Sequence, residues 1–121
     1  MAYTINKTDG TIVATVEDGI IDTTTSLSLI GRNYQSYGEA FNENLVKLLE
    51  NSASTTAPTA PLKGELWFDA SASSLKVYNG SQFTEISIRN AASAPTSALA
   101  TGTFWNDTTN DQLYMYDGTA F

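Results

Sequence analysis

A repeat near the carboxyl end is the feature that most limits what this 121-residue chain can fold into. Segments 64–83 and 102–121 align without a gap at a period of 38 residues, and seven of the twenty aligned positions are identical. The shared residues are two glycine pairs, Trp67/Trp105, Asp69/Asp107, Leu75/Leu113, Tyr78/Tyr116 and Phe83/Phe121. Each copy predicts a three-stranded meander: a strand with Trp, a polar turn opened by Asp, a strand ending in Tyr, an Asn-Gly or Asp-Gly turn, and a return strand beginning near Phe. So small a unit needs a neighbour or an identical chain to cover its apolar face.

The supply of core-forming residues is small. Leu, Ile, Val and Phe together make up 26 of 121 residues, whereas Thr, Ser, Ala and Asn make up 52. The first figure is close to the roughly 20% below which chains tend to be disordered. A single core of normal size is therefore not expected, and repetitive or partner-dependent β structure is.

The composition also excludes several kinds of chemistry. The chain has no His and no Cys, so it offers no imidazole base, no Cys nucleophile, no disulfide and no imidazole or thiolate metal site. Its net charge of −7 leaves no basic patch for nucleic acid. No apolar run is long enough for a membrane span. We therefore expect no catalytic, cofactor-binding or metal-binding residue, no nucleic-acid partner and no membrane insertion.

The amino-terminal residues predict β structure. β-forming residues flank Asp9-Gly10, a pair typical of tight hairpins because both central residues of a type I′ turn need a positive φ. We expect a hairpin of residues 3–7 and 11–16 there. Residues 26–30 alternate with period two and end at Gly31, which indicates a further strand.

An amphipathic helix is predicted over residues 37–50. Ser36 and Glu39 have the spacing of a capping box, and Glu43 and Lys47 have that of an i,i+4 ion pair. An isolated helix of this length is marginal, so its apolar stripe should cover the amino-terminal sheet or meet its own copies around a symmetry axis. The stripe is our candidate oligomer or anchoring interface: Tyr34, Tyr37, Phe41, Leu45 and Leu48.

These signals divide the chain into five segments. Residues 1–52 form an amino-terminal anchoring domain, 53–63 a Ser/Thr/Ala/Pro linker, 64–90 the first meander, 91–101 a second linker and 102–121 the second meander. The fold class is thus β-rich α+β: a hairpin or small sheet, one helix and two meanders on extended linkers. The hairpin register within each repeat stays open, since an Asn-Gly turn closes either as a two-residue loop or with a bulge.

The repeat residues support two interpretations. Aromatic faces stack on sugars, so the repeat aromatics could contact glycans; alternatively, they are the core of each meander. These residues are Trp67, Tyr78, Phe83, Trp105, Tyr116 and Phe121. Asp69 and Asp107 could resemble a glycosidase pair, but equivalent positions in two repeats favour turn caps. Residues 106–111 are rich in oxygen atoms, yet they lack the Gly and Glu of a calcium loop and favour a polar hairpin loop.

Three segments carry a resemblance to a known family. Residues 3–10, 29–51 and 64–80, the last containing GELWFD and LKVYNG, resemble the amino-terminal region of tail-fibre-like virion proteins. These proteins belong to T4-like myoviruses of cyanobacteria and other aquatic bacteria. The middle segment is the specific part, since the Trp-to-Tyr-Gly module recurs in other phage fibres.

The resemblance implies a structural protein of the phage tail or baseplate, made in the host cytoplasm and located in the virion. It implies a homotrimer that is anchored to other tail or baseplate proteins by its amino-terminal part. Such proteins often continue into a shaft and a receptor-binding tip, and we do not expect the tip in residues 1–121. The alternative is a carbohydrate-binding adhesion module that contacts host glycans through the repeat aromatics. An enzyme of the depolymerase class would need a site that the sequence does not offer.

Overall fold

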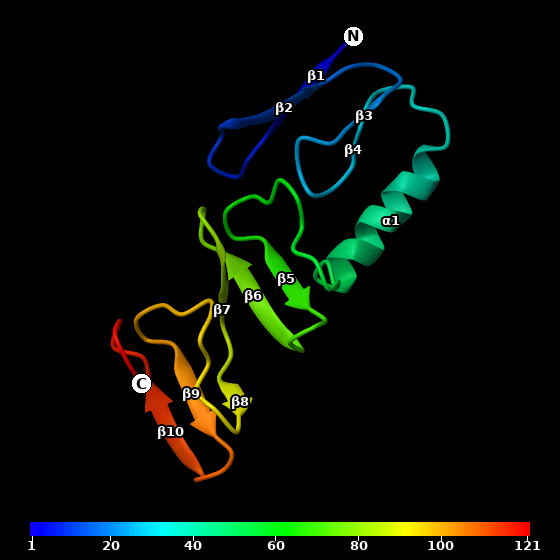
Figure 1. Cartoon of the computed structure of the whole chain (residues 1–121). Helices are drawn as coiled ribbons and strands as arrows, with labels where there is room; N and C mark the ends of the chain where they lie inside the picture. Colours follow the sequence, from blue (N-terminus) through cyan, green and yellow to red (C-terminus); the bar gives the residue numbers. More distant parts are fainter. The chain divides into compact units, whose positions relative to one another are not determined.

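The computed structural model describes residues 1–121 and consists of short strands with a single helix (Figure 1). The expected β-rich class with one helix and small antiparallel sheets is confirmed at that level. The chain divides into two units, one of residues 1–53 and 58–62 and the other of residues 54–57 and 63–121. No helix has both the length and the apolar character needed to cross a bilayer.

The first unit contains β1 (Tyr3–Asn6), β2 (Ile12–Val16), β3 (Ile21–Asp22), β4 (Leu29–Ile30) and α1 (Tyr37–Leu49). The second contains β5 (Leu66–Asp69), β6 (Ser74–Tyr78), β7 (Phe83–Glu85), β8 (Arg89–Ala91), β9 (Phe104–Asp107) and β10 (Gln112–Met115).

The predicted amino-terminal hairpin is confirmed, but its turn differs from the expected type. β1 and β2 pair antiparallel, and the amides of Lys7 and Gly10 bond to Thr11 O and Lys7 O at 2.7 and 3.0 Å. Gly10 has a φ of 84°, whereas Asp9 is not in the left-handed region. A type I′ turn needs positive φ at both central residues, so the loop is instead the three-residue kind with glycine at the left-handed position. The carboxylate of Asp9 closes it by accepting from the Thr11 amide at 2.9 Å.

The pairing of β3 with β4 brings the chain close to itself at Gly31. The strand expected over residues 26–30 is reduced to Leu29–Ile30. The Gly31 amide donates to Ile20 O at 2.8 Å, and a Cβ at Gly31 would lie 2.0 Å from Glu17 O. Only glycine fits this crossing without moving the backbone.

The helix is confirmed, but its expected cap and ion pair are not formed. Ser36 has a φ of 62°, and its hydroxyl makes no capping bond. A capping side chain needs extended backbone to reach the amides ahead of it, and the left-handed conformation turns the hydroxyl away. The Glu39 amide instead donates to Ser36 O at 3.2 Å. Lys47 forms no ion pair with Glu43, because its ammonium donates to Ser26 O.

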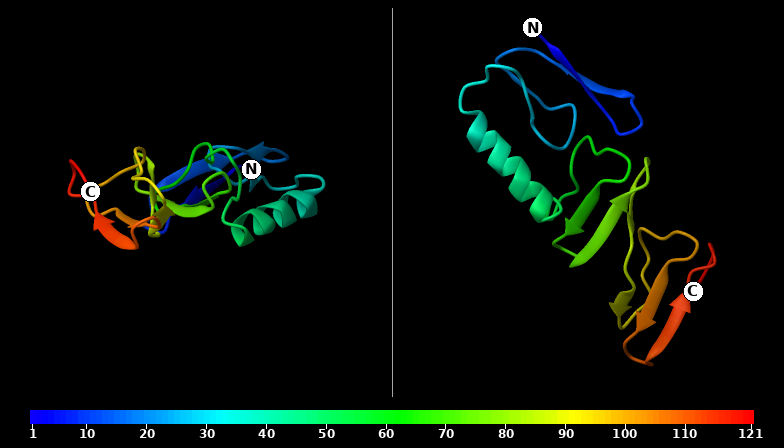
Figure 2. Two further views of the ribbon diagram at one scale, coloured as in Figure 1. Left: turned by 60° about the horizontal axis from the view of Figure 1, so that its bottom comes forward. Right: turned by 180° about the vertical axis from the view of Figure 1, so that it is seen from behind.

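Figure 2 shows α1 as one continuous helix in two further views. The hydrogen bonds from α1 to the rest of the first unit come from its polar side. The Asn44 side chain donates to Ser28 O at 2.7 Å and accepts from the Ser28 amide at 3.0 Å. Lys47 adds its bond to Ser26. No residue of α1 is buried, so the apolar stripe is not covered by the amino-terminal sheet.

The second unit contains two three-stranded sheets. β5, β6 and β7 form the meander expected of the first copy, with all pairs antiparallel. In the other sheet β10 pairs antiparallel with β9, while β8 pairs with β9 in parallel, so residues 102–121 supply only two strands and not the expected three-stranded meander. The parallel strand was not predicted, because it lies at the junction of the first meander and the expected linker.

Both expected linkers take part in the sheets. Residues 83–91 supply β7 to one sheet and β8 to the next, so the expected boundary between residues 90 and 91 falls inside β8. In the earlier linker, Ser54 forms a parallel bridge to Asp69. Ser54 therefore lies beside β5 in the same parallel arrangement that Ala91 has beside β9.

Little apolar material is buried. The buried hydrophobic residues are Ala14, Val16, Trp67 and Trp105, and only Val16 is fully buried. The accessible surface of the chain is 7811 Å². The chain by itself leaves much of its surface in water.

Candidate functional site

The six repeat aromatics form two clusters of matching geometry. In the first copy the Phe83 ring lies 5.3 Å from Trp67 and 5.2 Å from Tyr78. In the second copy the corresponding distances, from the Phe121 ring to Trp105 and Tyr116, are 5.5 and 5.2 Å. Trp67 and Trp105 are each 7% exposed. Edge-on packing of this kind adds to the burial free energy of the rings.

Each indole nitrogen bonds to the segment that precedes its repeat. Trp105 Nε1 donates to Ala91 O at 2.9 Å, and Trp67 Nε1 donates to Ser54 O at 3.3 Å. The same carbonyls accept the amides of Thr108 and Ala70 at 3.1 and 3.0 Å. These bonds attach the expected linkers to the Trp strands.

One face of each indole is covered by the residue at the same repeat position. Lys76 Nζ lies 4.9 Å from the Trp67 ring centroid, a cation–π contact. Tyr114, which is 38 residues further on, stacks on Trp105 at 5.1 Å and 19°. A sugar ring would have to displace Lys76 or Tyr114 to reach these indole faces.

Asp69 and Asp107 are buried turn carboxylates. Asp69 Oδ1 accepts from the amides of Ser71 and Ala72 at 3.0 and 3.3 Å, and Oδ2 accepts from Lys76 Nζ at 2.7 Å. The hydrogen bonds from Lys76 and Ser71 lower the pKa of Asp69 to about 2 despite its burial. A carboxyl with this pKa stays ionised and cannot serve as a general acid near neutral pH.

The second carboxylate has equivalent partners. Asp107 Oδ1 accepts from the amides of Thr109 and Asn110 at 2.8 and 3.3 Å, and Oδ2 accepts from Asn110 Nδ2 at 2.8 Å. The Asn110 side-chain bond and the Thr109 amide lower the pKa of Asp107. The oxygen atoms considered for calcium are here used to hold the turn.

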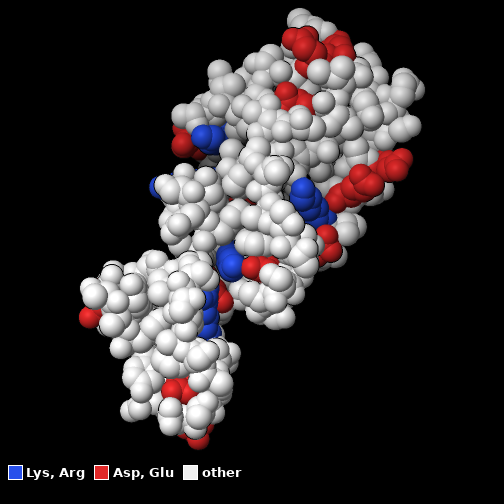
Figure 3. Space-filling view, viewed as in Figure 1, with Lys and Arg blue, Asp and Glu red and all other residues white.

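Two largely covered ion pairs lie beside the same cavity, one on the Trp side of the first sheet and the other between that sheet and β8. Lys76 pairs with Asp69, and Arg89 pairs with Glu85 while also donating to Ser97 O at 2.9 Å. They line a cavity of about 420 Å³ together with residues 93–98. Buried pairs of this kind satisfy one another rather than attract a ligand. The face drawn in Figure 3 shows basic side chains scattered singly, with no basic patch.

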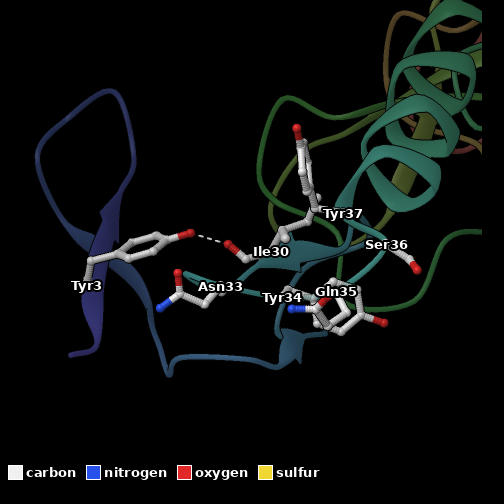
Figure 4. Close-up of a pocket in the computed structure, with 8 residues that line it drawn as sticks. Tyr3, Ile30, Asn33, Tyr34, Gln35, Ser36 and Tyr37 are labelled. Atoms are coloured by element: carbon white, nitrogen blue, oxygen red, sulfur yellow. Dashed lines mark hydrogen bonds between the residues drawn. The ribbon is translucent and has the colours of Figure 1, made fainter.

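The predicted helix stripe is largely exposed. Tyr37, Phe41, Leu45 and Leu48 are 66, 53, 48 and 57% exposed. Tyr34 is half-buried and lines a cavity of about 600 Å³ together with Tyr3 and Tyr37. Figure 4 shows Tyr3 reaching the Ile30 carbonyl at one side of this cavity. The stripe is thus available to a partner.

Sequence reasoning missed the second face of each repeat sheet. Leu66 and Phe68 alternate with buried Trp67 and Asp69 and are 38 and 36% exposed. Phe104 is 42% exposed in the equivalent strand. The alternation was visible in the sequence, but the covered set combines Trp67 with the charged Asp69, and so the pattern did not say which face is covered.

Comparisons with protein-family models, with curated proteins and with solved structures each found no match. The function must therefore be inferred from the chain's own residues and geometry.

Proposed function

We propose that this protein is a structural subunit of a bacteriophage tail fibre or of a fibre attached to the baseplate. In this role three copies assemble, the amino-terminal unit anchors them to other tail or baseplate proteins, and the β repeats project outward in host attachment. The protein is made in the host cytoplasm and resides in the virion. The role is structural and requires no catalytic residue, cofactor or metal ion.

The observation that carries the proposal is the mismatch between the small core and the large exposed apolar surface. Four apolar residues are buried, while large hydrophobic residues of α1 and of both repeat sheets are more than a third exposed. Monomeric soluble proteins rarely leave large continuous apolar patches in water. Self-association supplies the missing burial.

The resemblance of residues 3–10, 29–51 and 64–80 to tail-fibre-like virion proteins supports the same role. The acidic charge of −7 is compatible with it, since virion assembly needs no contact with nucleic acid at this position. The covered indole faces weigh against the adhesion alternative, in which Trp67 and Trp105 would stack on glycans.

Two measurements test the proposal. Sedimentation equilibrium of the 121-residue chain should give a trimer mass, and a folded monomer at all concentrations would contradict it. Antibody labelling of intact particles from a phage that encodes the chain should place it at the tail or baseplate. Labelling only on the capsid, or none on the particle, would refute the virion role.

A further inference from the structure

Each repeat sheet has one side on which the Trp and Asp side chains are buried and one side that is open. Residues directly opposite each other in a β ladder point to the same face. In the first sheet Trp67 pairs with Lys76 and Asp69 with Ser74, which places the ion pair and the indole on one face. Leu66 pairs with Val77 and Phe68 with Leu75, which places four apolar side chains on the other. We call these four residues and their counterparts in the second sheet the open face.

The second sheet repeats this arrangement. Met115 pairs with Phe104 and Leu113 with Asn106, on the side opposite to Trp105 and Asp107. Phe104, Leu113 and Met115 are 42, 55 and 53% exposed. Asn106, the polar member, donates through Nδ2 to Asn90 Oδ1 at 2.9 Å.

The open face carries no charged residue. The charged residues of these sheets, Asp69, Lys76, Glu85, Arg89 and Asp107, all belong to the Trp side by their register. A soluble sheet with one covered face normally turns polar residues outward on the other. Here most outward residues are apolar, with Thr84, Asn90 and Asn106 as the uncharged polar exceptions, which marks an interaction surface rather than a solvated one.

We infer that the open face of the repeat sheets binds the open face of further copies of this chain. The inference rests on the proposed assembly and names the surface through which the repeats contribute to it. Three of the four positions are apolar in both copies: Leu66/Phe104, Leu75/Leu113 and Val77/Met115. A partner that covers both sheets needs matching apolar faces at the same period of 38 residues, and an identical chain has them.

The distribution of charge also favours a further copy of this chain as the partner of the open face. Each chain carries a net charge of −7, so copies repel one another over most of their surface. The uncharged open face lets two copies meet without bringing carboxylates together. A charged partner would find no complementary group there.

The absence of Cys allows a direct test by cross-linking in the 121-residue chain. Single variants Leu66→Cys and Met115→Cys place a thiol on the open face, and Gln82→Cys places one on an exposed loop as the matched control. Leu45→Cys reports on the helix stripe. Under mild oxidation we expect covalently joined chains from Leu66→Cys and Met115→Cys, and little product from Gln82→Cys.

A second measurement separates assembly from folding. Phe104→Ser should raise the dissociation constant of the assembly roughly tenfold or more, because an apolar side chain is lost from the contact. The buried indole of Trp105 lies on the opposite face, so an unchanged fluorescence emission maximum would show that the sheet is still folded.

The outcomes are distinct. If the chain is oligomeric but only Leu45→Cys cross-links, and Phe104→Ser leaves the dissociation constant unchanged, the open face is not the seam and the inference is overturned. The proposed assembly then stands on the helix stripe. If the unmodified chain is a monomer, the assembly itself fails and the inference fails with it.

Discussion

Trp105 Nε1 donates a 2.9 Å hydrogen bond to Ala91 O, the last residue of the parallel strand β8. Trp67 makes the longer, equivalent bond to Ser54 at 3.3 Å. Because of these bonds each module includes the segment ahead of its Trp strand as well as the meander itself. Each Trp therefore packs in the sheet and also fixes, through its indole nitrogen, where the segment before its strand attaches.

Replacing the indole by a phenyl ring should separate its two roles. Trp105→Phe keeps most of the ring burial but loses the bond to Ala91, and we expect a loss of about 1 kcal/mol in the free energy of unfolding. Trp67→Phe should cost less, because its bond is longer. Urea denaturation followed by circular dichroism measures both. Equal losses would mean that the indole bonds do not matter for stability.

Removing the Trp side chains altogether tests the adhesion alternative. Trp67→Ala and Trp105→Ala should each cost about 3–5 kcal/mol, because a buried aromatic side chain leaves a cavity. We expect the sheets to lose structure in circular dichroism. A glycan array screen compares the unmodified chain with the same variants. Glycan binding that is lost while the fold stays intact would favour sugar recognition by the indoles.

Acid should weaken the first sheet through Asp69. Its pKa is lowered from 3.8 to about 2 by Lys76 and Ser71, so its contribution to stability is present above the unfolded pKa. That contribution is lost as the pH falls from about 4 toward 2. Urea midpoints measured over this range should fall for the unmodified chain and fall less for Asp69→Asn. Parallel curves for the two proteins would show that Asp69 is not responsible.

Two glycines of the first unit should respond in opposite ways to alanine. Gly31→Ala places a Cβ 2.0 Å from Glu17 O, so the β3–β4 crossing must open, and we expect severe destabilisation. Gly38→Ala meets no atom within 4 Å inside α1. It should stabilise the helix by about 0.5–1 kcal/mol because alanine loses less backbone entropy. Thermal unfolding of both variants compares them, and a tolerated Gly31→Ala would contradict the close approach.

The helix stripe offers a further test of assembly. Phe41→Ser and Leu45→Ser remove exposed apolar groups, so they should leave the hairpin intact while weakening self-association roughly tenfold or more each. Glu43→Gln, on the same helix, serves as the control. Sedimentation velocity over a dilution series measures the effect. Unchanged association in both serine variants would exclude the stripe as a contact between copies.

The sequence by itself determined the elements that depend on near neighbours. The hairpin at Asp9-Gly10 and the helix beginning at Tyr37 follow from turn residues and apolar spacing. These features depend on residues within one turn or one meander, where the order along the chain limits which groups can meet.

Only the tertiary structure decided what each element packs against. Ser36 has a left-handed backbone, so its hydroxyl does not cap the helix. Lys47 donates to the Ser26 carbonyl and does not pair with Glu43. β8 pairs in parallel with β9, which lies beyond the expected linker, and β5 has a covered face with Trp67 and Asp69 and an open face with Leu66 and Phe68. These outcomes depend on which of several groups distant in sequence becomes the hydrogen-bonding or packing partner. The spacing of residues along the chain does not indicate which partner is chosen.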